Sequence, residues 1–263
     1  MSKELPGLEI GRNIGFEKDF YSWIPRADHP ETRRPITTPT VGLVPSKNAF
    51  YPVFIDLTKP QPRNLFIVGD KSSGKDKLMS GLIRYACEST GIGYLKINAI
   101  TDQNDPNKLL SNLWIRRHAG KPNPTAFPEG PVATRILSLV SDNLNKEIGV
   151  FERKNLNPSI LIVENLANFL TKSESQPEKI KELKKILSYS GFHPHLNLTT
   201  VDYEDLPILE KNGLGPSVTP GVWLFGKAET SENPQLTHLF PESFRIWIPR
   251  GNYSKVFIVA FDL

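Results

Sequence analysis

Short runs of apolar, β-branched residues alternate with amphipathic segments through the middle of the chain. The apolar runs at 65–68 and 159–163 have the character of strands buried in a parallel sheet, and further strands are expected at 94–100, 195–200 and 222–225. Between them, apolar residues recur at helical spacing over 78–87, 107–118, 132–151, 177–190 and 203–211. Strands that alternate with helices predict an α/β fold, in which helices cover both faces of a mostly parallel sheet.

The two ends of the chain follow a different pattern. Residues 1–38 keep neither a helical nor a strand period for long, and we interpret them as an extended arm or linker. A single domain is expected over 39–263. Further strands are expected at 41–44, 52–57, 244–248 and 255–259, the last two as a C-terminal hairpin.

Composition narrows the class of protein. With 263 residues, of which 38% are apolar, the chain can bury the core of a large domain. The net charge of +4 is spread over 32 basic and 28 acidic residues without a long basic run, which does not indicate nucleic-acid binding. No apolar run of about 18 residues and no signal peptide occur, and the single Cys87 is expected to be a buried thiol. These features favour the cytosol, or the cytosolic part of a larger protein.

The strand at 65–68 leads into a glycine-bounded loop and the start of a helix. Gly69, Gly74 and Lys75 have the spacing of the phosphate-binding P-loop, G-x-x-x-x-G-K-[ST]. Small residues let backbone N–H groups point at phosphate oxygens, the helix N-terminus favours an anion, and the lysine reaches the terminal phosphates. The residues expected to bind nucleotide are Gly69, Asp70, Lys71, Ser72, Ser73, Gly74, Lys75, Asp76 and Lys77.

Asp76 departs from this motif, because it stands where a Ser or Thr hydroxyl would bind magnesium. Two like charges about 4 Å apart repel by about 4 kcal/mol at an effective dielectric constant of about 20, so this carboxylate opposes the β- and γ-phosphates. A magnesium ion bound between the carboxylate and the phosphates would make their interaction favourable, since oxygen ligands suit this ion. Lys71 and Lys77 also offset part of the repulsion. The sequence therefore leaves open whether the loop binds ATP with Mg²⁺ or is unoccupied.

The apolar strand at 159–163 ends in Glu164 and Asn165. In P-loop motors, a strand beside the P-loop strand ends in an Asp that organises magnesium, and a following Glu often orients the attacking water. Glu164 is one methylene longer than Asp, and the neutral amide of Asn165 is no base. We therefore assign no catalytic residue and expect little or no hydrolysis. The candidate metal ligands are Asp76 and Glu164.

The strand at 195–200 is expected to end next to the P-loop. A polar residue there could sense the γ-phosphate, and Thr199 or Thr200 is the candidate; the alternative is a threonine that caps the following segment. His193 and His195 point the same way but lack a third ligand, so we expect polar residues rather than a metal site. Core positions are expected for Trp114, Trp223 and Trp247; the alternative is that one of them belongs to a partner-binding pocket.

The order of these motifs resembles the FtsK/SpoIIIE-type motor domain over residues 39–263. Residues 52–57 are similar to the P-hhh-D-L strand that precedes the P-loop in that family, and residues 163–170 resemble its V-D-E-L-A-D-L-M segment. Residues 190–193 resemble the family's A-G-I-H-L segment, and residues 244–251 resemble its late strand that ends in P-x-G. Residues 41–44 are similar to a G-L-V/I segment of the type VII secretion coupling proteins EssC and EccC.

The resemblance implies a RecA/FtsK-like P-loop NTPase fold and a degenerate ATPase module of a type VII secretion motor, acting in substrate recognition or regulation. It implies a cytoplasmic module of a membrane-anchored parent chain, which reaches the membrane only through that parent. Its implied partners are neighbouring ATPase modules, as a hexamer in the full assembly, and small helical secreted substrates.

The chain departs from the active pattern of that family at Asp76, Glu164 and Asn165, and the sensor glutamine expected after the strand at 197–200 is absent. Two alternatives are kept. One is a DNA-translocase domain of the FtsK or conjugative type, although the sequence has no basic cluster for nucleic acid. The other is an active stand-alone NTPase.

Overall fold

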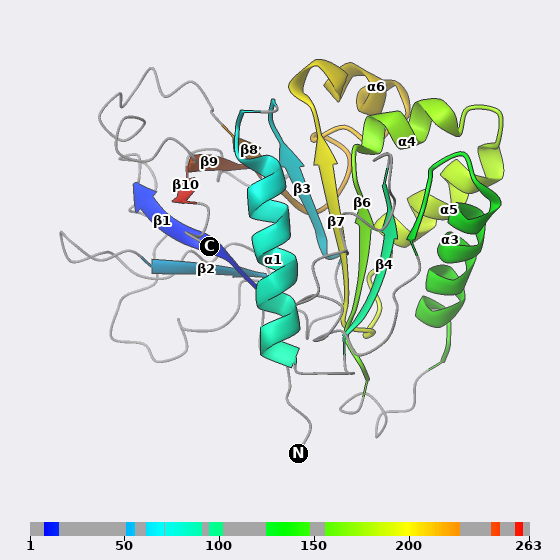
Figure 1. The fold of residues 1–263 in the computed structure, drawn as a ribbon, viewed down its shortest axis with the longest axis horizontal. Helices are drawn as coiled ribbons and strands as arrows, with labels where there is room; N and C mark the ends of the chain where they lie inside the picture. Colours follow the sequence, from blue (N-terminus) through cyan, green and yellow to red (C-terminus); the bar gives the residue numbers. More distant parts are fainter. Residues whose placement is uncertain are drawn as a thin grey trace.

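The computed structural model describes residues 8–15, 51–55, 62–70, 72–90, 95–101, 125–147, 156–226, 243–247 and 256–259. Within these residues the centre of the molecule is a ten-stranded sheet in the order β2-β1-β10-β9-β8-β3-β7-β6-β4-β5 (Figure 1). The strands from β8 to β5 in this order are parallel. The strands from β2 to β8 are joined by antiparallel pairings. The expected mostly parallel sheet is therefore confirmed.

The elements follow the expected alternation of strands and helices. The parallel strands are β3 (Asn64–Val68), β4 (Lys96–Ile100), β5 (Thr125–Ala126), β6 (Ser159–Val163), β7 (His195–Val201) and β8 (Val222–Gly226). The remaining strands are β1 (Leu8–Gly15), β2 (Tyr51–Ile55), β9 (Ser243–Trp247) and β10 (Val256–Val259). The helices are α1 (Lys75–Thr90), α3 (Pro131–Leu144), α4 (Leu166–Lys172), α5 (Pro177–Leu187) and α6 (Leu206–Lys211), with a 3-10 turn at Tyr203–Asp205.

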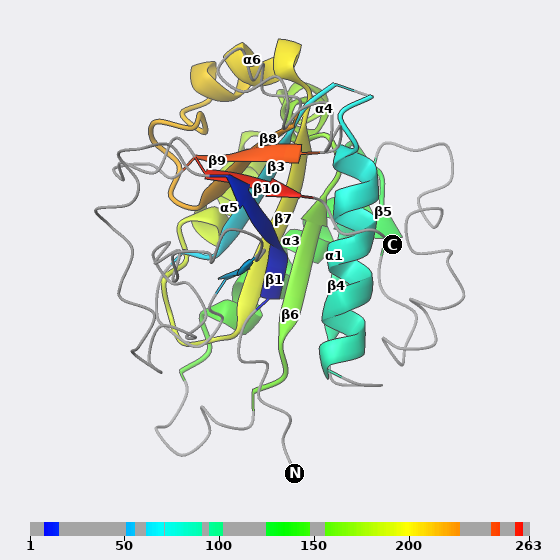
Figure 2. The same ribbon diagram turned by 90° about the vertical axis from the view of Figure 1, so that its left-hand side faces the viewer.

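Helices cover both faces of the parallel part of the sheet, as expected. Every residue of β3 is buried, and successive side chains along a strand point to opposite faces. Phe66 and Val68 of β3 belong to a hydrophobic cluster with residues of α3, α4, α5 and α6. On the other face, α1 contacts β3 and β7. Figure 2 shows α1 and α5 on opposite sides of the sheet.

The core also contains two residues whose burial was expected. Trp223 has no exposed surface and stacks on Phe66 with ring centroids 4.0 Å apart. Cys87 of α1 is buried. The side chain of Trp247 and all of Trp114 lie outside what the structure describes.

The inward face of α3 differs from the expected apolar stripe. Val132 and Leu139 belong to the apolar residues at helical spacing over 132–151, which predict an inward face, but they are 49% and 46% exposed. Ala133 and Leu137 are buried instead, because α3 packs against both α5 and β5 and is turned accordingly. The helix was expected to continue to residue 151, but it ends at Leu144 with Asn145 as its C-cap; residues 148–151 lie outside the described part of the chain.

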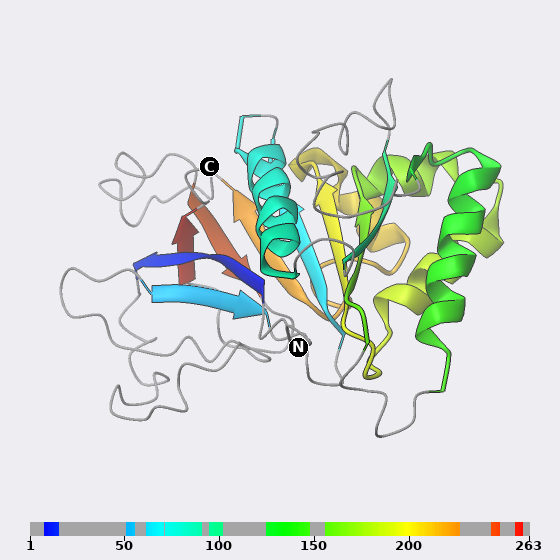
Figure 3. The same cartoon turned by 60° about the horizontal axis from the view of Figure 1, so that its bottom comes forward.

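The range 1–38, expected to be an arm, contains a strand of the sheet. β1 pairs antiparallel with both β10 and β2 (Figure 3). Its extended conformation matches the expectation, but its place in the sheet was not predicted. The C-terminal hairpin is confirmed, since β9 and β10 pair antiparallel. The domain boundary at residue 39 stays a prediction, and the elements expected at 41–44 and 107–118 lie outside the described residues.

In the described part of the chain, no helix combines the length and the apolar character that a membrane crossing requires.

Candidate functional site

The parallel strands β3, β7, β6 and β4 end at the same edge of the sheet, and a polar residue directly follows β7, β6 and β4. β7 pairs with β3 on one side and with β6 on the other. The expectation that 195–200 lies next to the P-loop strand is therefore confirmed. β6, the strand that ends before Glu164, is not directly beside the P-loop strand, because β7 lies between β6 and β3.

The loop between β3 and α1 is a tight turn fixed by Asp70 and Ser73. The backbone N–H and the Oγ of Ser73 donate to the carbonyl oxygen of Asp70, at 3.2 and 2.7 Å. The Oδ1 of Asp70 in turn accepts hydrogen bonds from the backbone N–H and the Oγ of Ser72, at 2.8 and 2.9 Å. The side chains of the loop therefore hold its backbone in shape.

Both glycines of the motif are needed for this shape. A Cβ on Gly69 would lie 2.2 Å from the Oγ of Ser73, so no larger residue fits there unless Ser73 moves. Gly74 has φ of +80°, a left-handed conformation that glycine adopts without strain. The N–H of Gly69 donates to the carbonyl oxygen of Val201 at 3.0 Å, which attaches the loop to the end of β7.

Lys75, the first residue of α1, points back across the loop. Lys75 as a whole is 7% exposed, and its Nζ donates to the carbonyl oxygen of Gly69 at 3.1 Å. The same Nζ forms an ion pair with the carboxylate of Asp202, the residue that follows β7. Sequence reasoning missed Asp202. The signal available was an acidic residue directly after the strand expected to lie beside the P-loop.

Asp76 and Lys77 are both exposed on the first turn of α1. A carboxylate at a helix N-terminus interacts favourably with the helix dipole, so Asp76 supports the start of α1 without any ligand. Lys71 lies outside the described residues. The assignment of 69–77 to nucleotide binding stays a prediction.

The carboxylate of Glu164 is turned toward the neighbouring strand. Glu164 is 7% exposed, and its Oε2 accepts a hydrogen bond from the Oγ1 of Thr101, the residue after β4. Its backbone N–H donates to the carbonyl oxygen of Ile100 at 2.8 Å. Glu164 therefore joins the ends of β6 and β4.

Asn165 is the N-cap of α4. It has φ of +52°, which is uncommon for a residue with a side chain, and its Oδ1 accepts the backbone N–H of Asn168 at 3.0 Å. Its own backbone N–H donates to the Oγ1 of Thr200 at 2.9 Å. The side-chain amide of Asn165, the second residue after β6, therefore serves as the cap of α4.

The two candidate sensor residues lie on opposite faces of β7. Thr199 is opposite Phe66 and Val163, whose side chains belong to the hydrophobic cluster under α3, α4 and α5. Its Oγ1 is buried and has no hydrogen-bond partner among the described residues. The hydroxyl of Thr200 accepts the backbone N–H of Asn165, at the edge of the sheet where β6 and β7 end. A sensor role for either threonine stays a prediction.

A buried polar chain crosses the opposite end of β7. The Oγ of Ser159 lies 2.8 Å from the Nδ1 of His195, and the Nε2 of His195 lies 2.9 Å from the Oδ1 of Asn197. Burial lowers the pKa of His195 to about 4, against the opposing hydrogen bond from Asn197. Burial also lowers the pKa of His193. Both ring nitrogens of His195 are thus engaged by side chains of the sheet.

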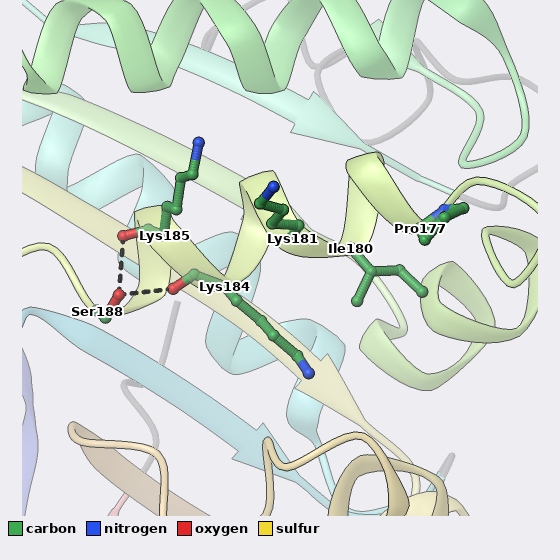
Figure 4. A pocket seen from close by; sticks show the side chains of 6 residues that line it. All are labelled: Pro177, Ile180, Lys181, Lys184, Lys185 and Ser188. Carbon is green, nitrogen blue, oxygen red and sulfur yellow. Dashed lines mark hydrogen bonds between the residues drawn. The ribbon is translucent and has the colours of Figure 1, made fainter.

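A shallow hollow on α5 lies on the helix face shown in Figure 4 and is lined by Pro177, Ile180, Lys181, Lys184, Lys185 and Ser188. Its lysines do not converge, since Lys184 points to one side of the helix and Lys181 and Lys185 point to the other. The last two form ion pairs on the same helix with Glu178 and Glu182, at 3.7 and 3.0 Å. We do not assign an anion-binding role to this hollow.

Comparison with known proteins gives matches among solved structures. No protein-family model and no curated protein matches this chain. ATPases 2 and 3 of EssC from Geobacillus thermodenitrificans superimpose with a TM-score of 0.55 at 13% identity, over 99% of this chain and 45% of that one. The pCW3 conjugation coupling protein TcpA, in its monomer form with ATPγS, gives 0.52 at 15% identity, over 80% of this chain and 63% of that one.

The chain has the fold of a P-loop ATPase domain. At these identities the likeness carries the fold alone. The chain spans less than two thirds of the length of either structure.

As a P-loop ATPase domain, the chain contains the loop that would hold the phosphates of a nucleotide. The glycine loop is present at the N-terminus of the 16-residue α1, with Lys75 at its base. A bound nucleoside triphosphate would bring its phosphates to this loop. The described residues contain no group of three or more His, Cys, Asp or Glu that could hold a metal ion by themselves. Asp76 and Glu164 as metal ligands stay a prediction.

Proposed function

We propose that the chain is a degenerate ATPase module of a type VII secretion motor, which hydrolyses little or no ATP and acts in substrate recognition or regulation. The P-loop ATPase fold and the likeness to the EssC ATPases support a motor-type role. In this proposal the module is the cytoplasmic part of a membrane-anchored parent chain. It packs against neighbouring ATPase modules, as a hexamer in the full assembly, and binds small helical secreted substrates.

The position of Asn165 carries the proposal of low hydrolysis. An attacking water needs a base or an orienting group, and the residue in that position is an amide whose acceptor oxygen already caps α4. Glu164, the other residue at the end of β6, accepts a hydrogen bond from Thr101. Neither residue is arranged to activate water, whereas the loop that would hold phosphates keeps its glycines and its lysine.

Phosphate release from Mg-ATP by the purified protein tests this proposal. Lys75→Ala is the matched control, because it removes the motif lysine, whose Nζ contacts the carbonyl oxygen of Gly69 in the loop. We expect both proteins to release phosphate at the background rate. Turnover by the wild-type chain that Lys75→Ala abolishes would contradict the proposal and establish an active NTPase.

A second candidate is a DNA-translocase or conjugative coupling domain, which the likeness to TcpA favours. Such a domain would bind the phosphate backbone of duplex DNA through Lys and Arg, with an affinity that falls steeply with salt. Titration of labelled duplex DNA at physiological ionic strength separates the two candidates. Tight binding that weakens as salt is raised would favour the translocase and count against the secretion module.

A further inference from the structure

The ion pair between Lys75 and Asp202 joins the lysine of the P-loop to an internal anion. The Lys75 side chain is 9% exposed and that of Asp202 is 23% exposed, so the pair is screened less than a surface pair. The residues lie 127 positions apart in the sequence, and the fold brings them together at the edge where β3 and β7 end.

The backbone around Asp202 is held in place from three directions. Val201, one residue earlier, accepts the N–H of Gly69 at 3.0 Å, and Asp202 itself accepts the N–H of Asp205 at 3.1 Å. The hydroxyl of Tyr203, one residue later, donates to the carbonyl oxygen of Gly226 at 2.5 Å. The carboxylate of Asp202 is therefore positioned at the base of the loop by the ends of β7 and β8.

We infer that Asp202 takes the place of a nucleotide phosphate on Lys75 and thereby lowers the affinity of the P-loop for nucleoside triphosphates. This inference rests on the proposed function of the loop as a nucleotide site. In a P-loop the lysine contacts the β- and γ-phosphates, so an incoming triphosphate must separate Lys75 from Asp202 or share the lysine with it. Sharing places a carboxylate next to a phosphate, and like charges repel at that distance.

Two further carboxylates follow Asp202 in the same 3-10 turn, at Glu204 and Asp205. Burial and the charge of Glu204 raise the pKa of Asp205, while Lys75 acts in the opposite direction. Glu204 is exposed. This exposed residue serves as a control, because its neutralisation changes the net charge by the same amount without removing the carboxylate that pairs with Lys75.

Calorimetric titration with ATP, with and without Mg²⁺, tests the inference. We expect Asp202→Asn to raise ATP affinity by about tenfold or more over the wild-type chain, since a largely buried hydrogen bond between charged groups no longer has to be broken. Glu204→Gln should change the affinity by less than about twofold, because an exposed charge is screened by solvent and salt. A gain for Glu204→Gln that equals the gain for Asp202→Asn would overturn the inference, since it would report net charge alone.

The dependence on Lys75 gives a second test. In a Lys75→Ala background, Asp202→Asn should give no gain in ATP affinity, because the lysine that it releases is absent. A gain that persists without Lys75 would overturn the inference. Circular dichroism checks that the variants fold, and Asp202→Ala is the replacement if Asp202→Asn does not, with the same gain expected.

The inference and the proposed function fail in different experiments. Equal ATP affinities of the wild-type chain and Asp202→Asn, or no binding by either, would overturn the role of Asp202 and leave the secretion module standing. Rapid Lys75-dependent turnover by the wild-type chain would overturn the degenerate module, while the comparison of ATP affinities would still decide the role of Asp202.

Discussion

The backbone N–H of Asn165 donates to the Oγ1 of Thr200 at 2.9 Å, and this hydrogen bond joins the end of β6 to β7. It also supports a residue at φ +52°, where a side chain is costly. The neighbouring Thr199 offers a natural comparison. Thr199 and Thr200 are both 1% exposed, but the Oγ1 of Thr199 has no hydrogen-bond partner in the described part of the chain.

Thr200→Val should lower the free energy of unfolding by about 1–3 kcal/mol, because it leaves the N–H of Asn165 without its acceptor. The same substitution one residue earlier, Thr199→Val, should be neutral or stabilising, since it replaces an unpaired hydroxyl with a methyl group in an apolar cluster. Urea denaturation measures both. Equal losses in the two variants would show that the hydrogen bond to Asn165 is not what distinguishes them.

Asn165→Glu restores the glutamate of the active pattern, yet it should not produce a fast ATPase, because Asp76 and Asp202 remain. It should also cost about 1 kcal/mol of stability, since it replaces the side chain that caps α4. Asn165→Asp keeps a capping oxygen and is the control for stability. Denaturation and phosphate release test the two parts separately, and rapid turnover by Asn165→Glu would refute the first.

Asp76→Thr should raise the affinity for Mg-ATP by about tenfold, because it removes a carboxylate from the helix tip and supplies a hydroxyl for magnesium. The gain is smaller than the full repulsion between two charges, since Asp76 is exposed and solvent screens it. Isothermal calorimetry checks the change in affinity. No gain, or weaker binding, would mean that repulsion from Asp76 is not what limits binding.

Acid should destabilise the fold through His195. Its pKa is lowered to about 4 by burial, so the folded chain keeps it neutral while the unfolded chain takes up a proton near the ordinary value. Stability from this group is complete above about pH 6.5, is lost as pH falls toward about 4, and amounts to about 3 kcal/mol at most. The nearby positive charges of Arg63 and His193 act in the same direction.

The test compares unfolding free energies of the wild-type chain and His195→Asn across pH 4 to 7. We expect a flatter pH dependence in the variant, whatever its absolute stability. A slope unchanged between pH 6.5 and 4 would show that His195 does not remain neutral in the folded chain.

The strongest local signals in the sequence predicted the parallel core. β3, the glycine loop and α1 are contiguous, so strand, turn and helix chemistry all point to the same structure at 64–90. The fully apolar β6 was equally clear. Helical spacing alone could not orient α3, because Ala133 and Leu137 are inward only as a result of packing against other elements.

Contacts between distant segments account for the site features that the sequence did not reveal. Lys75 and Asp202 are far apart in the sequence, and only the strand order places their side chains together. The strand order likewise put β7 between β3 and β6, which no local pattern specifies. Asn165 was recognised as an unsuitable base, but its role as a helix cap depends on a left-handed backbone that composition does not predict.

The place of β1 bears on where the chain can be cut. β1 separates β2 from β10, so a fragment that begins at residue 39 would leave both of those strands with an unpaired backbone edge. Bare edges of this kind recruit strands from other molecules. A fragment whose boundaries are chosen from the ATPase motifs alone would therefore be prone to aggregate. A fragment that retains residue 8 onward would keep β1 paired with β2 and β10.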